Sequence, residues 1–386
     1  MKKLLTVPSF RWVDQTGEVQ SLIYQGEDFQ GKPTVVFAWY ASPATLEKRK
    51  PRHSDKFPGI ILLHGGAGTA FREWAQQWAA QGYAVLAMDL SGRRPDKNGE
   101  EGKPLRLENG GPDQNNEGTF DAIRTDDYSD DWFYHASANA IRAHSLLRDL
   151  PGVDPGRTAV TGISWGGILT CAVASLDSRF QAAVPVYGCG FLDQSYFMHS
   201  EFEALGPELA RRWYSAYDPG ALLKDCRTPI FFINGSNDAF FPIDITMKSY
   251  EAVTQAPKNL LIIPNFAHGH EPVWARTEVA RFVDSILKKG PALPTVQTPA
   301  VNGNRITSSY ADPGSVAKSA TLNYAVKTGP INELKWNEVP ATLGPKEISV
   351  EQSDLNNTYF FFNLTDSEGN VVSSPLQFSP ASSTTP

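Results

Sequence analysis

The chain has 386 residues, of which 41% are hydrophobic and 20% are charged, and its net charge at neutral pH is −7. This composition is ordinary for a globular protein, and the length exceeds what one hydrophobic core usually serves, so we predict one large and one small domain. The acidic balance, without a Lys/Arg stripe, excludes nucleic acid as the expected partner. No apolar run approaches the ~20 residues of a membrane-spanning helix, so we expect no membrane span.

The N-terminus begins Met-Lys-Lys-Leu-Leu-Thr-Val-Pro, without the longer apolar segment and small-residue cleavage site of a signal peptide. Two compartments therefore stay open, the cytoplasm or, after removal of a signal, an extracytoplasmic one. The three cysteines, Cys171, Cys189 and Cys226, have no metal-like spacing, and their odd number gives no disulfide framework. We expect buried free thiols.

Up to about residue 290, short apolar segments alternate with helix-length segments, which is typical of β-α-β units around a parallel sheet. Apolar residues at helical spacing over Asp131–Leu150 predict one of the helices. The segments predicted as buried strands are Gly59–Leu63, Ala84–Leu90, Thr158–Gly162, Ile230–Asn234 and Asn259–Ile263.

Residues 91–128 form a long polar insertion directly after the predicted strand that ends at Leu90. Open α/β folds bind ligands at the carboxyl ends of their strands, so we expect this insertion to cover that edge and to serve function. After it, Ser129 is predicted to cap the helix, with Asp130 and Asp131 complementing the helix dipole. A calcium site formed by Asp126, Asp127, Asp130 and Asp131 is the alternative.

The sequence Gly162-Ile163-Ser164-Trp165-Gly166-Gly167 follows a predicted strand and opens a small-residue helix. This is a G-x-S-x-G motif between strand and helix, the context in which a serine nucleophile sits on a strained turn. The glycines let strand and helix approach closely, and the helix N-terminus directs free N–H groups toward a developing oxyanion. We predict Ser164 as the nucleophile and the N–H of Trp165 as an oxyanion donor.

A serine nucleophile needs an adjacent base and an acid that orients the base, in the chain order serine, acid, histidine for this motif. Asp238 and His268 follow two successive predicted strands and should emerge at the same sheet edge as Ser164. We predict Asp238 as the acid, because its rival Asp244 is better placed to cap the next helix. We predict His268 as the base, because its rival His270 runs into the following helix.

The second oxyanion donor is expected in the loop His64-Gly65-Gly66-Ala67-Gly68, which follows another predicted strand. The N–H of Gly66 or that of Ala67 would serve, and we predict Gly66. His64 precedes Ser164 in the chain and is interpreted as a structural histidine that hydrogen-bonds this loop. His268 and His270 have no third ligand nearby in sequence, so we expect no metal and no cofactor.

Beyond residue 290 the pattern changes to the period of two that is typical of strands. Thr321–Val326 alternates, and Asn357–Leu364 is rich in aromatic residues. We predict a catalytic domain over residues 1–290, a Pro-rich linker over 291–300, and a small Ig-like β-sandwich over 301–386. The predicted site residues all precede the linker, so we expect the catalytic domain to be active without the sandwich.

Residues 30–290 resemble α/β-hydrolases of the acetylxylan esterase and dienelactone hydrolase-like group, which are related to the prolyl-oligopeptidase catalytic domain. The resemblance implies a doubly wound, mostly parallel sheet and a serine hydrolase, with Ser164 where dienelactone hydrolases have cysteine. It rests on the stretches Leu62-Leu63-His64-Gly65-Gly66, Ala87-Met88-Asp89-Leu90-Ser91-Gly92-Arg93, Leu150-Pro151-Gly152-Val153-Asp154, Arg157–Gly167, Asp177–Val184 and the loops of Asp238 and His268.

We therefore predict a serine carboxylesterase that hydrolyses short-acyl, acetyl-type esters, with small molecules or carbohydrates as the alcohol. The polar insertion favours this substrate class, since it offers little apolar wall for a long acyl chain. Trp132, Tyr134 and Tyr187 are interpreted as core residues, with stacking on a sugar ring as the alternative. The other functions left open are a serine peptidase of the prolyl-oligopeptidase type and an inactive binding protein. The sequence leaves the oligomeric state open.

Overall fold

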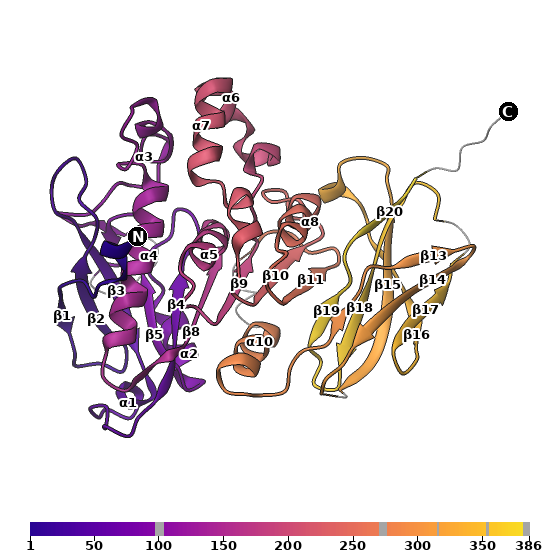
Figure 1. Cartoon of the computed structure of the whole chain (residues 1–386), viewed down its shortest axis with the longest axis horizontal. Helices are drawn as coiled ribbons and strands as arrows, with labels where there is room; N and C mark the ends of the chain where they lie inside the picture. The colour runs from indigo at the N-terminus through magenta and orange to yellow at the C-terminus, as the bar shows by residue number, and fades with distance from the viewer. Residues whose placement is uncertain (97–103, 270–275, 315, 353–354, 381–386) are drawn as a thin grey trace.

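The computed structural model describes residues 1–96, 104–269, 276–314, 316–352 and 355–380. These residues form two large sheets that lie side by side in Figure 1, the first at the left and centre and the second at the right. The α/β-hydrolase architecture predicted from the sequence is confirmed: a mostly parallel sheet with helices on both faces comes first, and an antiparallel all-β unit follows.

The first sheet has nine strands in the order β1-β2-β3-β5-β4-β8-β9-β10-β11. All five predicted strands are present. β4, β5, β8, β9, β10 and β11 run parallel, whereas β1, β2 and β3 are antiparallel additions at one edge. The strands are β1 (Phe10–Asp14), β2 (Gln20–Gln25), β3 (Val35–Ala41), β4 (Phe57–Leu63), β5 (Ala84–Met88), β8 (Val153–Ile163), β9 (Ala182–Val186), β10 (Ile230–Gly235) and β11 (Lys258–Ile263).

Helices cover both faces of this sheet. α4 (Trp132–Asp149) and α5 (Trp165–Leu176) pack against each other and against the central strands, while α2 (Arg72–Ala80) and α10 (Thr277–Leu287) cover the opposite face. α8 (Ile243–Ala252) packs on β10 and β11, and the short α1 (Pro43–Leu46) contacts α2. The interior of α5 is wholly apolar or small, because it lies between the sheet and α4.

Two excursions leave this frame on the same side of the molecule, at the top of Figure 1. The polar insertion contains β6 (Arg93–Arg94), β7 (Leu105–Arg106) and α3 (Asn116–Phe120), and a second excursion carries α6 (His199–Leu205) and α7 (Pro207–Tyr217). Trp213 of α7 donates a hydrogen bond to the carbonyl of Thr119, and its ring packs against Phe120 and Phe202. The two excursions therefore form one cover above the sheet.

The predicted cap of α4 is wrong. The helix begins at Trp132 with Asp131 at the N-cap position, and the hydroxyl of Ser129 instead donates to the carboxylate of Asp127. The Asp131 carboxylate accepts hydrogen bonds from the Ala122 N–H (3.0 Å) and the Tyr217 hydroxyl (2.9 Å), so it ties the insertion to α7. Within the described ranges, no cluster of His, Cys, Asp and Glu is arranged to hold a metal ion.

The second sheet is antiparallel, in the order β12-β14-β17-β16-β15-β18-β19, with β13 paired to β14 and β20 to β18. Its end strands β12 and β19 contact each other, so the sheet curls almost into a barrel. The strands are β12 (Thr295–Val296), β13 (Ala300–Asn302), β14 (Arg305–Ala311), β15 (Ala317–Val326), β16 (Asn337–Leu343), β17 (Glu347–Glu351), β18 (Thr358–Asp366), β19 (Val371–Ser373) and β20 (Gln377–Ser379). β12 lies within the segment predicted as linker.

The two sheets pack together where the edge strand β11 meets β19. The Ile262 N–H donates to the Ser373 hydroxyl at 2.7 Å, and the Ser373 hydroxyl donates to the Asn363 side chain. This cover explains why β18 is buried on both faces: Phe360, Phe361 and Phe362 are each at most 2% exposed although they are consecutive. The junction also protects the edge of the first sheet from pairing with another chain.

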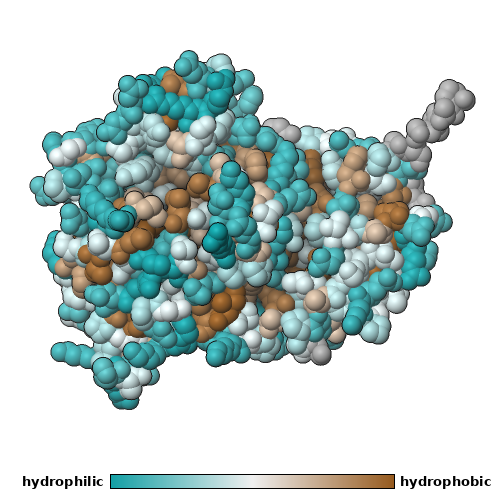
Figure 2. All heavy atoms as spheres, viewed as in Figure 1, coloured by the Kyte–Doolittle hydropathy of each residue, from teal (hydrophilic) through white to brown (hydrophobic). Residues whose placement is uncertain are grey.

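Cys171, Cys189 and Cys226 are buried free thiols, as predicted. The face drawn in Figure 2 is mostly hydrophilic, with apolar residues in separate small groups. Among the residues that the structure describes, no helix has the length and apolar character needed to cross a bilayer.

Candidate active site

Ser164 occupies the single position between β8 and α5, where the backbone takes φ 59° and ψ −121°. A side chain at Gly162 would place its Cβ 2.2 Å from the carbonyl oxygen of Gly166, and one at Gly166 would lie 2.1 Å from that of Leu63. The turn is therefore possible only with glycine at these two positions. The Ser164 N–H donates to the carbonyl of Val186 at 2.9 Å, which fixes the turn to the neighbouring strand.

Asp238 and His268 contact each other from the loops that follow β10 and β11. The Asp238 carboxylate is fully buried; one oxygen accepts from the N–H groups of Phe240 (2.8 Å) and Phe241 (2.9 Å). Its other oxygen lies 2.8 Å from Nδ1 of His268. With Nδ1–H donating to the carboxylate, the neutral imidazole carries its lone pair on Nε2.

Ser164 and His268 line one cavity of about 380 Å³ at the carboxyl edge of the sheet. The structure thus brings together the three residues that the sequence predicted as nucleophile, base and acid. The other lining residues come from the oxyanion-loop candidate, the insertion, the α6 region and the Asp238 loop: Gly66, Ala67, Gln114, Asn115, Thr119, Phe120, Trp165, Phe197, Met198, Glu201 and Phe240.

Asp244 and His270 are the alternatives to Asp238 and His268 that the sequence offered. Asp244 lies in the first turn of α8, with Pro242 rather than Asp244 at the N-cap, so its predicted capping role is wrong. Its carboxylate accepts from the Ile245 N–H at 3.0 Å, and it does not line the cavity. His270 lies outside the described residues.

Gly66 and Trp165 lie side by side in the cavity wall. A Cβ at Gly66 would come within 2.7 Å of Cδ1 of Trp165, so the loop and the helix start are in close contact. The predicted structural role of His64 is confirmed: its Nδ1 lies 2.6 Å from the carbonyl of Gly65, and its Nε2 accepts from the Leu90 N–H at 2.9 Å. This histidine therefore fixes the loop to Leu90, two residues beyond the end of β5.

Two family models match the chain. The model of acetyl xylan esterase (AXE1) matches residues 13–204, and that of the prolyl oligopeptidase family matches residues 125–288. Together they cover residues 13–288, which include β2 to β11 and the residues Ser164, Asp238 and His268. The chain belongs to the α/β-hydrolase superfamily.

Solved structures share the hydrolase fold. The acetyl xylan esterase from Paenibacillus sp. R4 superposes with a TM-score of 0.59 at 21% identity, covering 74% of this chain and 92% of that one. Acetyl xylan esterase 1 from Thermoanaerobacterium sp. JW/SL YS485 gives 0.56 at 19% identity, with the same coverage. The acylaminoacyl peptidase of Pyrococcus horikoshii gives 0.50 at 18% identity, covering 74% of this chain and 43% of that one.

A curated relative, the uncharacterized peptidase YuxL of Bacillus subtilis (strain 168), is 26% identical over 254 residues. That match covers 61% of the hydrolase but only 33% of YuxL, so the chain corresponds to about a third of this relative.

The sequence missed one wall of the hydrolase cavity, formed by Phe197, Met198 and Glu201. The sequence does contain one signal for a helix in this excursion. Pro207 follows Gly206 and occupies the first position of α7, where proline is favoured. The alternative role in sugar stacking for Trp132 and Tyr187 is not supported. Both are fully buried and neither lines the cavity: the Trp132 indole donates to the carbonyl of Leu90, and Tyr187 packs on the His268 ring.

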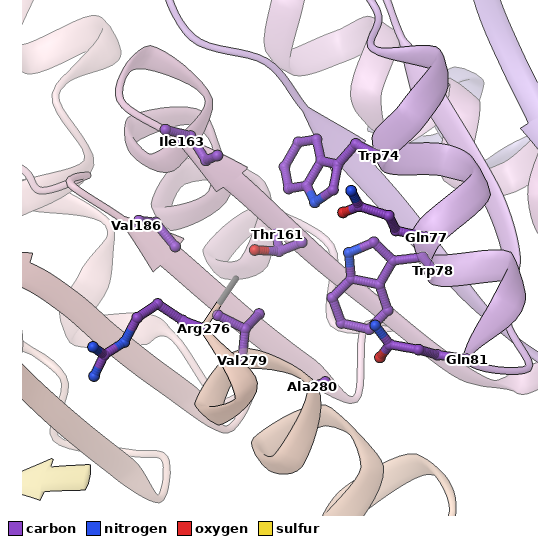
Figure 3. A pocket seen from close by; sticks show the side chains of 10 residues that line it. All are labelled: Trp74, Gln77, Trp78, Gln81, Thr161, Ile163, Val186, Arg276, Val279 and Ala280. Carbon is purple, nitrogen blue, oxygen red and sulfur yellow. The ribbon is translucent and has the colours of Figure 1, made fainter. Parts of the chain in front are cut away.

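A second, much smaller cavity lies between α2 and α10 on the other face of the sheet (Figure 3). Trp74 and Trp78 of α2 face Val279 of α10 across Thr161 of β8. Its volume of about 30 Å³ suits little more than a water molecule, and neither Ser164 nor His268 lines it. The candidate active site is therefore the cavity lined by Ser164 and His268.

Proposed function

We propose that the hydrolase is a carboxylesterase with Ser164 as nucleophile, His268 as general base and Asp238 as the residue that orients His268. The observation that supports this most is the 2.8 Å contact from His268 Nδ1 to the buried Asp238 carboxylate, with Ser164 in the same cavity. Without such a base, a serine hydroxyl is a weak nucleophile at neutral pH.

In the proposed mechanism, Ser164 Oγ bonds to the ester carbonyl carbon while its proton moves to Nε2 of His268. The N–H groups of Trp165 and Gly66 stabilise the oxyanion, and the Asp238 carboxylate stabilises the imidazolium. The C–O bond to the alcohol then breaks, and the alcohol leaves with the proton from His268. A water molecule, deprotonated by His268, attacks the acyl-enzyme, and Ser164 recovers its proton when the acid leaves.

The cavity favours a small substrate. Its volume of about 380 Å³ lies near the lower end of the range of about 300–1,000 Å³ for ligand pockets. Phe120, Phe197 and Phe240 close its sides with aromatic surface, while Gln114 and Asn115 of the insertion supply amide groups. We propose a short acyl group, acetyl or close to it, on a polar alcohol that includes carbohydrate. The similarity to acetyl xylan esterases agrees with this substrate class.

A p-nitrophenyl ester series from acetate to laurate, with acetylated xylan and a peracetylated sugar, tests the substrate class. We expect kcat/KM to fall for acyl chains longer than butyrate, because Phe120, Phe197 and Phe240 close the sides of the cavity and would obstruct a longer chain. A rise beyond butyrate would contradict the short-acyl proposal. Failure to deacetylate every sugar would remove the carbohydrate part and leave the rest.

The second candidate is a serine peptidase of the prolyl-oligopeptidase type. The match of that family to residues 125–288 and the likeness to an acylaminoacyl peptidase favour it. Assays with peptide anilides distinguish the two: turnover of anilides exceeding that of p-nitrophenyl acetate would favour the peptidase.

Replacing Gly66 with alanine tests the proposed oxyanion donor. The new Cβ would lie 2.7 Å from Cδ1 of Trp165, so the loop and the helix start would have to separate. We expect kcat/KM for p-nitrophenyl acetate to fall by about 100-fold, the loss typical of one missing oxyanion donor. Gly329→Ala is the matched control, because a Cβ there meets no atom within 4 Å. Equal activity of the two variants would remove Gly66 from the mechanism.

A further inference from the structure

Asp238 and His268 lie on loops that both contact one short segment of the second sheet. This segment, residues 332–336, begins within the single turn Ile331–Glu333 and ends where β16 starts at Asn337. Loops generally move more than the elements they connect, so what holds these two loops bears on catalysis.

Asn237, the residue before Asp238, holds the first loop. Its side-chain Nδ2 donates to the carbonyl oxygens of Asn332 (3.0 Å) and Leu334 (2.8 Å). Its backbone N–H donates to the carbonyl of Phe266 at 3.0 Å, in the loop that carries His268. Asn237 is thus bonded to the 332–336 segment through its side chain and to the His268 loop through its backbone.

Asn265 holds the second loop, three residues before His268. Its Nδ2 donates to the carbonyl of Trp336, and its Oδ1 accepts from the Trp336 N–H, both at 2.9 Å. The Asn265 side chain therefore forms two hydrogen bonds with the backbone of Trp336, as a residue of a neighbouring strand would. Trp336 is only 3% exposed and packs on Phe361 of β18, so the anchor is rigid. The backbone of Asn265 has φ 52°, a conformation that asparagine tolerates better than most residues.

The two asparagines are also linked to each other through Ser236. The Ser236 hydroxyl accepts from the Asn265 N–H (2.8 Å) and donates to Oδ1 of Asn237 (2.7 Å). Both loops and the 332–336 segment therefore form one hydrogen-bonded unit directly behind the contact between His268 and Asp238.

We propose that the second sheet is a positioning element of the active site, acting through the 332–336 segment on Asn237 and Asn265. This proposal rests on the proposed function. Asn237 and Asn265 fix the separation of two loops whose side chains must meet, and misplacement by about 1 Å can cost about 100-fold in rate. The hydrogen bonds predict that residues 1–290 alone are less active than the full chain, although the predicted site residues all lie within them.

The test uses Asn237→Ala and Asn265→Ala in the full chain, with Asn259→Ala as matched control. Nδ2 of Asn259 donates to the carbonyl of Pro294 at 2.9 Å and thus joins β11 to the start of the second sheet without contacting either loop. All three variants lose a hydrogen bond from an asparagine side chain to a backbone carbonyl. If Asn237→Ala does not fold, Asn237→Ser replaces it in the test. The serine side chain is polar but too short to reach residues 332–334.

We expect the two loop variants to lower kcat for p-nitrophenyl acetate by about tenfold or more, with KM within about twofold of wild type. The pH profile of kcat should shift in the same variants, because the contact between His268 and Asp238 loosens. Asn259→Ala should keep the wild-type kcat and profile. Loop variants that match Asn259→Ala in kcat and pH profile would overturn the proposal.

A measurement without substrate separates this proposal from the proposed function. The downfield proton resonance of His268 Nδ1–H reports its hydrogen bond to Asp238, and it should broaden or move in the loop variants but not in Asn259→Ala. If the wild-type protein turned over no ester and no anilide, the proposed function would be refuted. The resonance would still show whether Asn237 and Asn265 position His268 against Asp238. An unchanged resonance in both loop variants would refute the positioning role.

Discussion

Replacing Ser164 with alanine should lower kcat/KM for p-nitrophenyl acetate by about four orders of magnitude or more, the scale of loss seen when a serine nucleophile is removed. The substitution deletes the Oγ that forms the acyl-enzyme and leaves the backbone and the glycine contacts of the turn unchanged. Thermal unfolding should stay near wild type, since only one hydroxyl is lost. Initial rates and a thermal melt on the same preparations measure both outcomes.

Ser175→Ala provides the matched control for this substitution. Ser175 lies on the same helix, α5, and its hydroxyl donates to the carbonyl of Cys171 at 2.8 Å, away from the cavity. This variant should keep nearly full activity. Retention of more than a few per cent of activity by Ser164→Ala would exclude Ser164 as the nucleophile.

His268→Ala should cause a loss of similar size, again of several orders of magnitude. Without the imidazole, Ser164 has no base to take its proton, and the buried Asp238 carboxylate loses the Nδ1–H donor 2.8 Å away. A small loss of stability is therefore expected as well. The measurement is the rate with p-nitrophenyl acetate, alongside unfolding of each variant.

His270→Ala is the matched comparison, because it removes an imidazole two residues later in the sequence. We expect it to cost far less than His268→Ala. If His270→Ala were the more damaging substitution, the base would be His270, and the contact between His268 and Asp238 would be structural.

The sequence by itself determined the parts of this protein whose signals are local. The five buried parallel strands were read correctly because each is a short apolar run bounded by turn residues. The turn at Ser164 followed from Gly162 and Gly166, since no larger residue fits between strand and helix. The meeting of Asp238 with His268 followed from topology, because the carboxyl ends of neighbouring parallel strands share one edge.

Only the tertiary structure decided which distant groups meet. Ser129 carries a good capping signal, yet its hydroxyl bonds Asp127, while Asp131 is recruited by Tyr217, 86 positions away. Phe197 and Glu201 belong to an excursion whose place over the cavity depends on packing between α7 and the insertion. Asn237 and Asn265 read as ordinary loop asparagines in sequence, and their partners lie 95 and 71 positions further on. Sequence periodicity reports the burial of neighbouring residues, whereas hydrogen bonds between distant segments depend on how complete elements pack.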